Sequence, residues 1–165
     1  MREFKTDLTG KVAVVTGARQ GLGKIFATAL AAAGAEVIIM ARNVKALEEA
    51  AAEIHAETGA VCHYCPIDIL DESSVERAAR FVMDTCGRLD ILFNNAALGR
   101  GSTPLQDTSL EEWNATIGTN LTGTFLCMKH FGRIMIAQQS GKVINMTSLA
   151  ARAVFADACT GAYDC

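Results

Sequence analysis

Residues 11–23 read Lys-Val-Ala-Val-Val-Thr-Gly-Ala-Arg-Gln-Gly-Leu-Gly, and this stretch decides the fold. The apolar run Lys11–Val15 is typical of a parallel strand that is buried on both faces. The glycines that follow let the backbone turn sharply into a helix. Because a helix start carries unpaired N–H groups and the positive end of the helix dipole, this turn is predicted to hold a phosphate group.

Strands and helices alternate along the rest of the chain. Apolar residues recur at helical spacing from Leu22 to Ala33, and Gly34 ends this first helix. Four more strands are expected, at Val37–Met40, Val61–Ile67, Leu89–Phe93 and Lys142–Met146. Further helices are expected from Val44 to about Gly59, from an Asp71 cap to Gly87, and from Ser109 to Gln139 with a break near Gly118–Gly123. This alternation predicts a doubly wound parallel sheet, a Rossmann-like α/β fold, in a single domain over residues 1–165.

The composition excludes several classes of protein. The 165 residues fit one domain, and half of them are apolar. Fifteen basic and eighteen acidic residues leave a net charge of -3, which is not the basic footprint of a nucleic-acid binder. No apolar run reaches the roughly 20 residues that a membrane span needs, and the N-terminus lacks the apolar core of a signal peptide. We therefore expect a cytoplasmic protein with no nucleic-acid or membrane partner.

The cysteines suggest free thiols rather than disulfides or a metal site. Four of the six lie in apolar or periodic segments, and the absence of an export signal favours a reducing compartment. The stretch Cys62-His63-Tyr64-Cys65 resembles half of a zinc site. In a strand, however, Cys62 and Cys65 would point to opposite faces, and the sequence offers no second ligand pair. We expect no metal, and we expect His55 and His130 to lie on helix surfaces.

Several motifs, in order along the chain, resemble those of the short-chain dehydrogenase/reductase family. The spacing Thr-Gly-x-x-x-Gly-x-Gly at Thr16–Gly23 is similar to that family's glycine turn. The other matching segments are Leu8–Lys11, Asp68–Ile69, Asn94–Ala97, Thr119–Gly123, Ile144–Ser148 and Ala162–Asp164. The resemblance implies a nicotinamide dinucleotide whose pyrophosphate lies on the turn.

The turn and the resemblance together imply a set of cofactor-binding residues. They are Thr16, Gly17, Arg19, Gly21, Leu22, Gly23, Arg42, Asp68, Ile69, Asn94 and Ala96. Members that use NAD place an acid just after the second strand, where this chain has Ala41-Arg42-Asn43. The Arg42 guanidinium can pair with a 2′-phosphate, and Arg19 offers a second cation. We therefore expect NADP in preference to NAD, the alternative for Arg42 being a solvated surface arginine.

Three residues match the family's catalytic positions. The resemblance implies that Tyr163 is the acid/base, that Ser148 hydrogen-bonds the substrate carbonyl, and that Asn120 holds a water in the proton relay. Hydride transfer to a ketone leaves an alkoxide that needs a proton, and a phenol serves once its pKa falls toward neutrality. Taken alone, each of the three is an ordinary packing, capping or turn residue. The implied reaction is hydride transfer between NADP(H) and a small-molecule carbonyl or secondary alcohol.

The sequence also departs from the family pattern. The family's lysine belongs at position 167, four residues beyond Tyr163, whereas the sequence given ends at Cys165. We therefore expect a sheet that is incomplete at its C-terminal edge, and an incomplete copy of an enzyme whose full-length form is a homodimer or homotetramer. Two functions stay open: this oxidoreductase, or a non-catalytic module that binds a dinucleotide or dimerises without turnover.

Overall fold

The computed structural model describes residues 6–99 and 103–149. Its sheet is built from β1 (Val12–Thr16), β2 (Glu36–Ala41), β3 (Cys62–Pro66), β4 (Ile91–Asn94) and β5 (Lys142–Asn145). The strands lie in the order β3-β2-β1-β4-β5, and every neighbouring pair is parallel. The doubly wound, Rossmann-like sheet is thus confirmed. Because the order reverses between β1 and β4, a crevice is expected at the carboxyl ends of these two strands.

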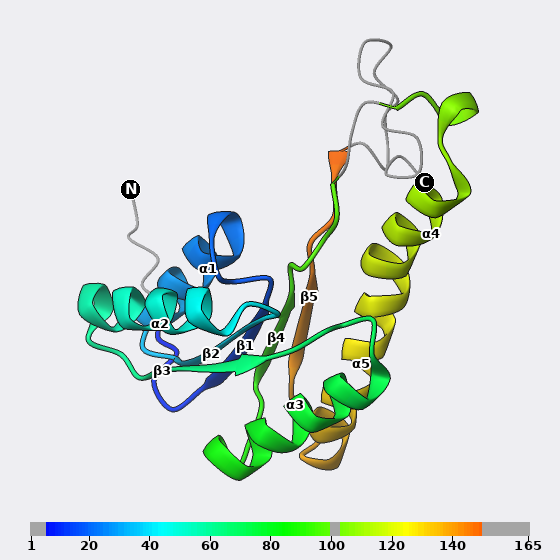
Figure 1. The fold of residues 1–165 in the computed structure, drawn as a ribbon. Coiled ribbons are helices and arrows are strands. Elements are labelled where there is room, and N and C mark those ends of the chain that lie inside the picture. Colours follow the sequence, from blue (N-terminus) through cyan, green and yellow to red (C-terminus); the bar gives the residue numbers. More distant parts are fainter. Residues whose placement is uncertain (1–5, 100–102, 150–165) are drawn as a thin grey trace.

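Helices cover both faces of this sheet (Figure 1). They are α1 (Gly21–Ala32), α2 (Val44–Thr58), α3 (Glu72–Cys86), α4 (Leu110–Ile117) and α5 (Thr124–Ala137). One apolar core joins α1 and α2 to the sheet, and a second joins α3 and α5 to its other face. Both faces are therefore buried along β1, β2 and β4, as their continuous apolar runs predicted. No helix formed by the described residues has the length and apolarity that crossing a membrane requires.

Local capping explains where α2, α3 and α4 begin. The side chains of Asn43 and Asp71 accept hydrogen bonds from first-turn N–H groups of α2 and α3. Ser109 and Glu112 form a reciprocal capping box at the start of α4. Gly87 ends α3 at a φ of 69°, a left-handed conformation that glycine adopts without strain. The predicted cap and stop of the third helix are both confirmed.

Two expectations about the long helical region were wrong. Residues Gly118–Gly123 do not break the helix, because they keep right-handed helical dihedrals and form a π-helical turn that joins α4 to α5. A Cβ on Gly123 would lie 2.7 Å from Ile69, so glycine allows this wide turn to pack closely. His130 is buried rather than exposed, and its Nε2 lies 2.9 Å from Glu72 Oε1. His55, by contrast, is exposed as expected.

The strand β5 is the least covered part of the sheet. In the described part of the chain it pairs with β4 alone, and all four of its residues are exposed. Val143 and Ile144 keep more than two fifths of their surface accessible. An apolar edge strand of this kind is a pairing surface for further chain. Among the described residues, this edge of the sheet is thus open.

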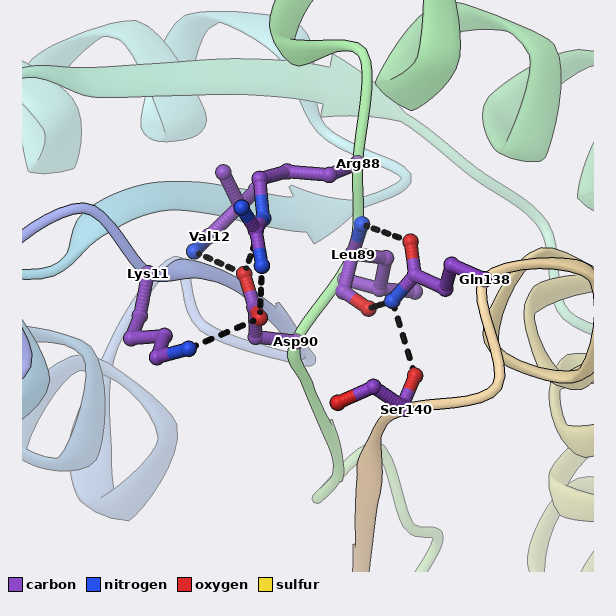
Figure 2. A network of polar contacts seen from close by, with 7 residues as sticks. All are labelled: Lys11, Val12, Arg88, Leu89, Asp90, Gln138 and Ser140. Atoms are coloured by element: carbon purple, nitrogen blue, oxygen red, sulfur yellow. Dashed lines mark hydrogen bonds and ion pairs between the residues drawn. The ribbon is translucent and has the colours of Figure 1, made fainter.

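A buried carboxylate ties β1 to β4 at the start of both strands (Figure 2). Asp90 is 5% exposed, and its carboxylate accepts hydrogen bonds from the Val12 N–H at 3.0 Å and from Arg88 at 2.6 and 2.8 Å. Lys11 Nζ lies 3.4 Å away. Burial alone would raise the pKa of Asp90, but Arg88, the Val12 N–H and Lys11 lower it more, so the pKa lies below its usual value.

The same end of the sheet is tied to β5 by one amide side chain, also drawn in Figure 2. Gln138, just after α5, accepts a hydrogen bond from the Leu89 N–H at 3.3 Å. Its Nε2 donates to the carbonyls of Leu89 and Ser140. The segments that enter β4 and β5 are therefore held together before either strand begins.

A second tie joins β1 to β4 where the two strands end. Thr16 Oγ1 accepts hydrogen bonds from the N–H groups of Asn95 and Ala96, each at 3.1 Å. The Asn95 amide in turn donates to the Thr16 carbonyl at 3.0 Å. A Cβ on Gly23 would lie 2.5 Å from Asn95 Nδ2, and a Cβ on Gly17 would lie 2.8 Å from Ala96 Cα. Two glycines of the turn are thus required by the approach of the segment after β4.

We expect Asp90→Asn to lower the free energy of unfolding by about 1–3 kcal/mol at neutral pH, because a buried charged acceptor of several donors is lost. Since folding lowers the pKa of Asp90, its stabilisation is fully present above the unfolded value of about 3.9 and is lost as the pH falls through the folded value. Urea denaturation across this pH range measures the difference. The matched control is Asp84→Asn, which removes the same charge from an exposed site on α3. Equal stability of the two variants at neutral pH would contradict the assignment.

Candidate dinucleotide site

A cleft of about 810 Å³ opens at the carboxyl ends of the strands. Segments that follow β1, β2, β3 and β4 line it, together with α4. The lining residues are Gly17, Arg19, Gln20, Gly21, Ala41, Arg42, Asn43, Ile67, Asp68, Ile69, Leu70, Asn95, Ala96, Ala97, Leu98, Glu111, Ala115 and Thr119. The cleft therefore lies where the strand order predicts a ligand site.

The start of α1 differs from the starts of α2, α3 and α4. Gln20, which precedes α1, has an extended backbone and makes no side-chain hydrogen bond to the first turn. The corresponding residues of α2, α3 and α4 all make one. Gly21 begins α1 at a φ of 59° and lines the cleft, and a Cβ built on it would meet nothing within 4 Å. The residue before α1 does not bind the backbone N–H groups of the first turn, so these groups are available to a ligand in the cleft.

The structure brings seven of the eleven predicted cofactor residues to the cleft. These are Gly17, Arg19, Gly21, Arg42, Asp68, Ile69 and Ala96. The other four, Thr16, Leu22, Gly23 and Asn94, are not among the lining residues. Thr16 and Gly23 are buried against the segment after β4, so their visible role is to shape the turn.

Charged groups of both signs surround the cleft. Arg19 and Arg42 are exposed at its edge, and Arg19 donates a hydrogen bond to the side chain of Gln20. Asp68 is half-buried, its N–H bonded to Ser74 Oγ and one carboxylate oxygen accepting from the Leu70 N–H, each at 3.0 Å. These bonds fix the backbone after β3, while the two guanidinium groups remain at a position where an anion can reach them.

Sequence reasoning missed part of the cleft wall. Asn95 lines the cleft, although only its neighbours Asn94 and Ala96 were predicted. Glu111, Ala115 and Thr119 line it from α4 and the turn that follows. These three are spaced four residues apart, so they share one helix face. The four-residue spacing can be recognised in the sequence, but the sequence does not show which edge of the sheet this helix face approaches.

Two of the three candidate catalytic residues, Asn120 and Ser148, lie among the described residues. Asn120 lies in the π-helical turn, where its Oδ1 accepts from the Leu98 N–H at 2.8 Å and its Nδ2 donates to the Leu98 carbonyl at 3.2 Å. Its side chain therefore holds the loop after β4, and the expected water-binding role stays a prediction. Ser148 is half-buried in the segment that follows β5. Tyr163 lies outside the described residues.

The segment leading to Ser148 is anchored on β4. The Met146 N–H donates to the Asn94 carbonyl at 2.9 Å, and Asn94 Nδ2 donates to Asn145 Oδ1 at 2.8 Å. Asn94 Oδ1 is buried without a hydrogen-bond partner among the described residues. The side chain of Asn94 thus joins the ends of β4 and β5, which explains its burial away from the cleft.

Comparison with known proteins gives a consistent result. A family model described as short chain dehydrogenase matches residues 11–163. The 3-oxoacyl-[acyl-carrier-protein] reductase of Synechocystis sp. is 42% identical over 147 residues, which are 88% of this chain and 58% of that protein. A metagenomic short-chain oxidoreductase solved in complex with NADP is 37% identical, with a TM-score of 0.84, over 93% of this chain and 69% of that one.

A solved NAD+-bound xylitol dehydrogenase is 29% identical, with a TM-score of 0.89, over 95% of this chain and 60% of that one. The chain thus spans less than two thirds of several relatives that it matches. The glycine turn, the parallel sheet and the family match over residues 11–163 agree, and the chain belongs to the short-chain dehydrogenase/reductase family.

Proposed function

We propose that this cleft binds NADP(H) and that the protein is an oxidoreductase transferring a hydride between this cofactor and a carbonyl or secondary alcohol. The observation that carries the proposal is the start of α1. It opens on a cleft of about 810 Å³ with a glycine turn and without a side-chain cap. This volume falls within the range of small-molecule sites, and a helix start of this kind suits a pyrophosphate.

The residues present fit a dinucleotide along the whole cleft. Gly17 and Gly21 bring backbone rather than side chains to the phosphate position. Asp68 and Ile69, beyond β3, are proposed to contact the adenine end, as the family resemblance implies. Ala96, beyond β4, lies on the side where β5 and Ser148 follow. A bound cofactor would therefore extend across the point where the strand order reverses.

The preference for NADP over NAD rests on this chain's own side chains. Relatives include proteins solved with NADP and with NAD+, so family membership alone does not choose. After β2 this chain carries Ala41-Arg42-Asn43, and both Arg42 and Arg19 line the cleft. A guanidinium matches the geometry of the 2′-phosphate of NADP. It has no hydrogen-bond acceptor for the 2′-hydroxyl that NAD carries instead.

The proposed chemistry divides between cofactor and protein. The nicotinamide supplies or accepts the hydride when the cofactor is bound. Ser148 would donate a hydrogen bond to the substrate oxygen, and Tyr163 would give that oxygen its proton or remove it. Asn120 would keep the loop after β4 in place through its two bonds to Leu98. The substrate class is a small-molecule carbonyl or alcohol.

We also propose that the full-length enzyme is a cytoplasmic homo-oligomer. Large apolar side chains are exposed along α4, α5 and the turn between them, namely Leu110, Leu121, Phe125 and Ile136. Exposed large apolar side chains are found on faces that another subunit covers.

Replacing Arg42 by Ala should weaken NADPH binding by about 10- to 100-fold, because a charge-assisted hydrogen bond contributes about 1.5–3 kcal/mol. Binding of NADH, which lacks the 2′-phosphate, should change little. Fluorescence titration of both nucleotides measures the two affinities. Lys45→Ala, which removes an exposed cation at the second residue of α2, is the control and should affect neither. Equal weakening of NADPH and NADH by Arg42→Ala would contradict the assignment.

Turnover separates the enzyme from a binding module. The assay follows NADPH oxidation with a panel of ketones, using the polypeptide with any residues that its reading frame encodes beyond Cys165. Ser148→Ala and Tyr163→Phe should each lower kcat by at least about 100-fold, because each removes a hydrogen-bond donor to the reacting oxygen of the substrate. The NADPH affinity should stay within about twofold, because neither variant removes a group proposed to bind the cofactor. Unaltered kcat in Tyr163→Phe would refute its role. Tight NADPH binding with no turnover of any ketone would instead favour the non-catalytic module.

A further inference from the structure

Three side chains with metal-binding chemistry meet at the end of the sheet opposite the cleft. Glu36 is the first residue of β2, His63 the second residue of β3, and Cys86 the last residue of α3. The cleft is lined by segments that follow the strands, whereas these residues lie where β2 and β3 begin. The cluster is therefore separate from the proposed cofactor site.

The three side chains are already within contact of one another. His63 Nε2 lies 2.7 Å from Glu36 Oε1, and Cys86 Sγ lies 3.6 Å from the same oxygen. The nitrogen, the sulfur and the carboxylate oxygen all lie within 4.8 Å of one another. Each residue is half-buried, so the group is shielded on one side and open to water on the other.

This donor set is one that zinc takes in proteins: an imidazole nitrogen, a cysteine sulfur and a carboxylate oxygen. Tetrahedral bonds of about 2.0–2.3 Å would place the donor atoms roughly 3.3–3.7 Å apart. The observed separations of 2.7 Å, 3.6 Å and at most 4.8 Å bracket that range. Small side-chain rotations therefore convert the hydrogen-bonded cluster into a coordinating one, without moving a strand.

We propose that Glu36, His63 and Cys86 bind a zinc-type divalent cation, with water in the fourth coordination position. On binding, the Cys86 S–H bond breaks, its proton passes to solvent, and the sulfur forms a bond to the metal. His63 binds as the neutral imidazole through Nε2. The cation joins β2, β3 and α3, and it links Glu36 to Cys86, which lies 50 positions later in the sequence. Because the cluster lies at the end of the sheet opposite the cleft, we assign the cation no part in hydride transfer.

The neighbouring cysteines are placed differently. Cys65 is buried in the core shared with α3 and α5, whereas Cys62 packs toward the core shared with α1 and α2. The two cysteines of the Cys62–Cys65 stretch thus lie on opposite faces, as the sequence predicted. The partners of His63 come instead from β2 and α3, which are distant in the sequence. Cys62 and the exposed His55 are therefore matched controls for Cys86 and His63.

The test is titration with Co²⁺ as a spectroscopic probe, and with Zn²⁺ by calorimetry. Cys159 and Cys165 lie outside the described residues, so both are replaced by Ser in the parent protein. We expect one Co²⁺ per chain and a thiolate-to-cobalt charge-transfer band. Cys86→Ser should abolish the band. Cys86→Ser, His63→Gln and Glu36→Gln should each weaken the metal affinity by at least about 100-fold. This loss exceeds the 10–100-fold typical of a residue that only hydrogen-bonds a metal ligand. Cys62→Ser and His55→Gln should leave binding unchanged.

Several outcomes would overturn the site. They are no stoichiometric binding by the parent, a band that survives Cys86→Ser, or equal loss in Cys62→Ser. Zn²⁺ should also raise the thermal unfolding midpoint of the parent and not that of Glu36→Gln. Glu36→Gln keeps the shape of the side chain, so this variant still tests the site if Cys86→Ser does not fold. An unaltered metal response in Glu36→Gln would show that the cluster is a polar contact only.

Discussion

The rest of the structure depends on the contact between the Asn95 amide and the glycine turn. Asn95 follows β4, and it donates to the carbonyl of Thr16 at the end of β1, 79 residues earlier. That approach leaves no room for a Cβ on Gly17 or Gly23. Once the turn is held against β4, α1 must begin beside the carboxyl end of β1. Gly17 and Asn95, from the two sides of this contact, both line the cleft.

Polar side chains divide the sheet into two functional ends. Where the strands begin, Asp90 and Gln138 join β1, β4 and β5, and these ties contribute stability (Figure 2). Where they end, Asn95 and Asn94 join neighbouring strands while the backbone of the turn stays available to a ligand. The arrangement separates the groups that hold the sheet from the groups that would hold a cofactor. The proposed metal cluster belongs to the first end.

Most of the fold was predictable because its signals are local. Apolar runs gave the five strands, and the Asp71 cap and the Gly87 stop bounded α3. The glycines at 118 and 123 suggested a break, but the chain forms a π-helical turn there, and Gly123 leaves room for the Ile69 side chain. His130 looked like a surface residue, because its burial against Glu72 depends on how α5 meets α3. Likewise Asn95 was missed, since a contact across 79 residues leaves no local pattern.

The most direct measurement is amide hydrogen exchange over residues 16–23 in the ligand-free Asn95→Ala variant. Loss of the amide donor should speed exchange across the glycine turn by about tenfold or more, in line with the 1–3 kcal/mol cost of an unsatisfied partner. Exchange near Val12, which Asp90 holds, should stay unchanged. Asn114→Ala, at an exposed position of α4, should leave the turn protected. Unaltered exchange in Asn95→Ala would contradict the claim that this side chain holds the turn in place.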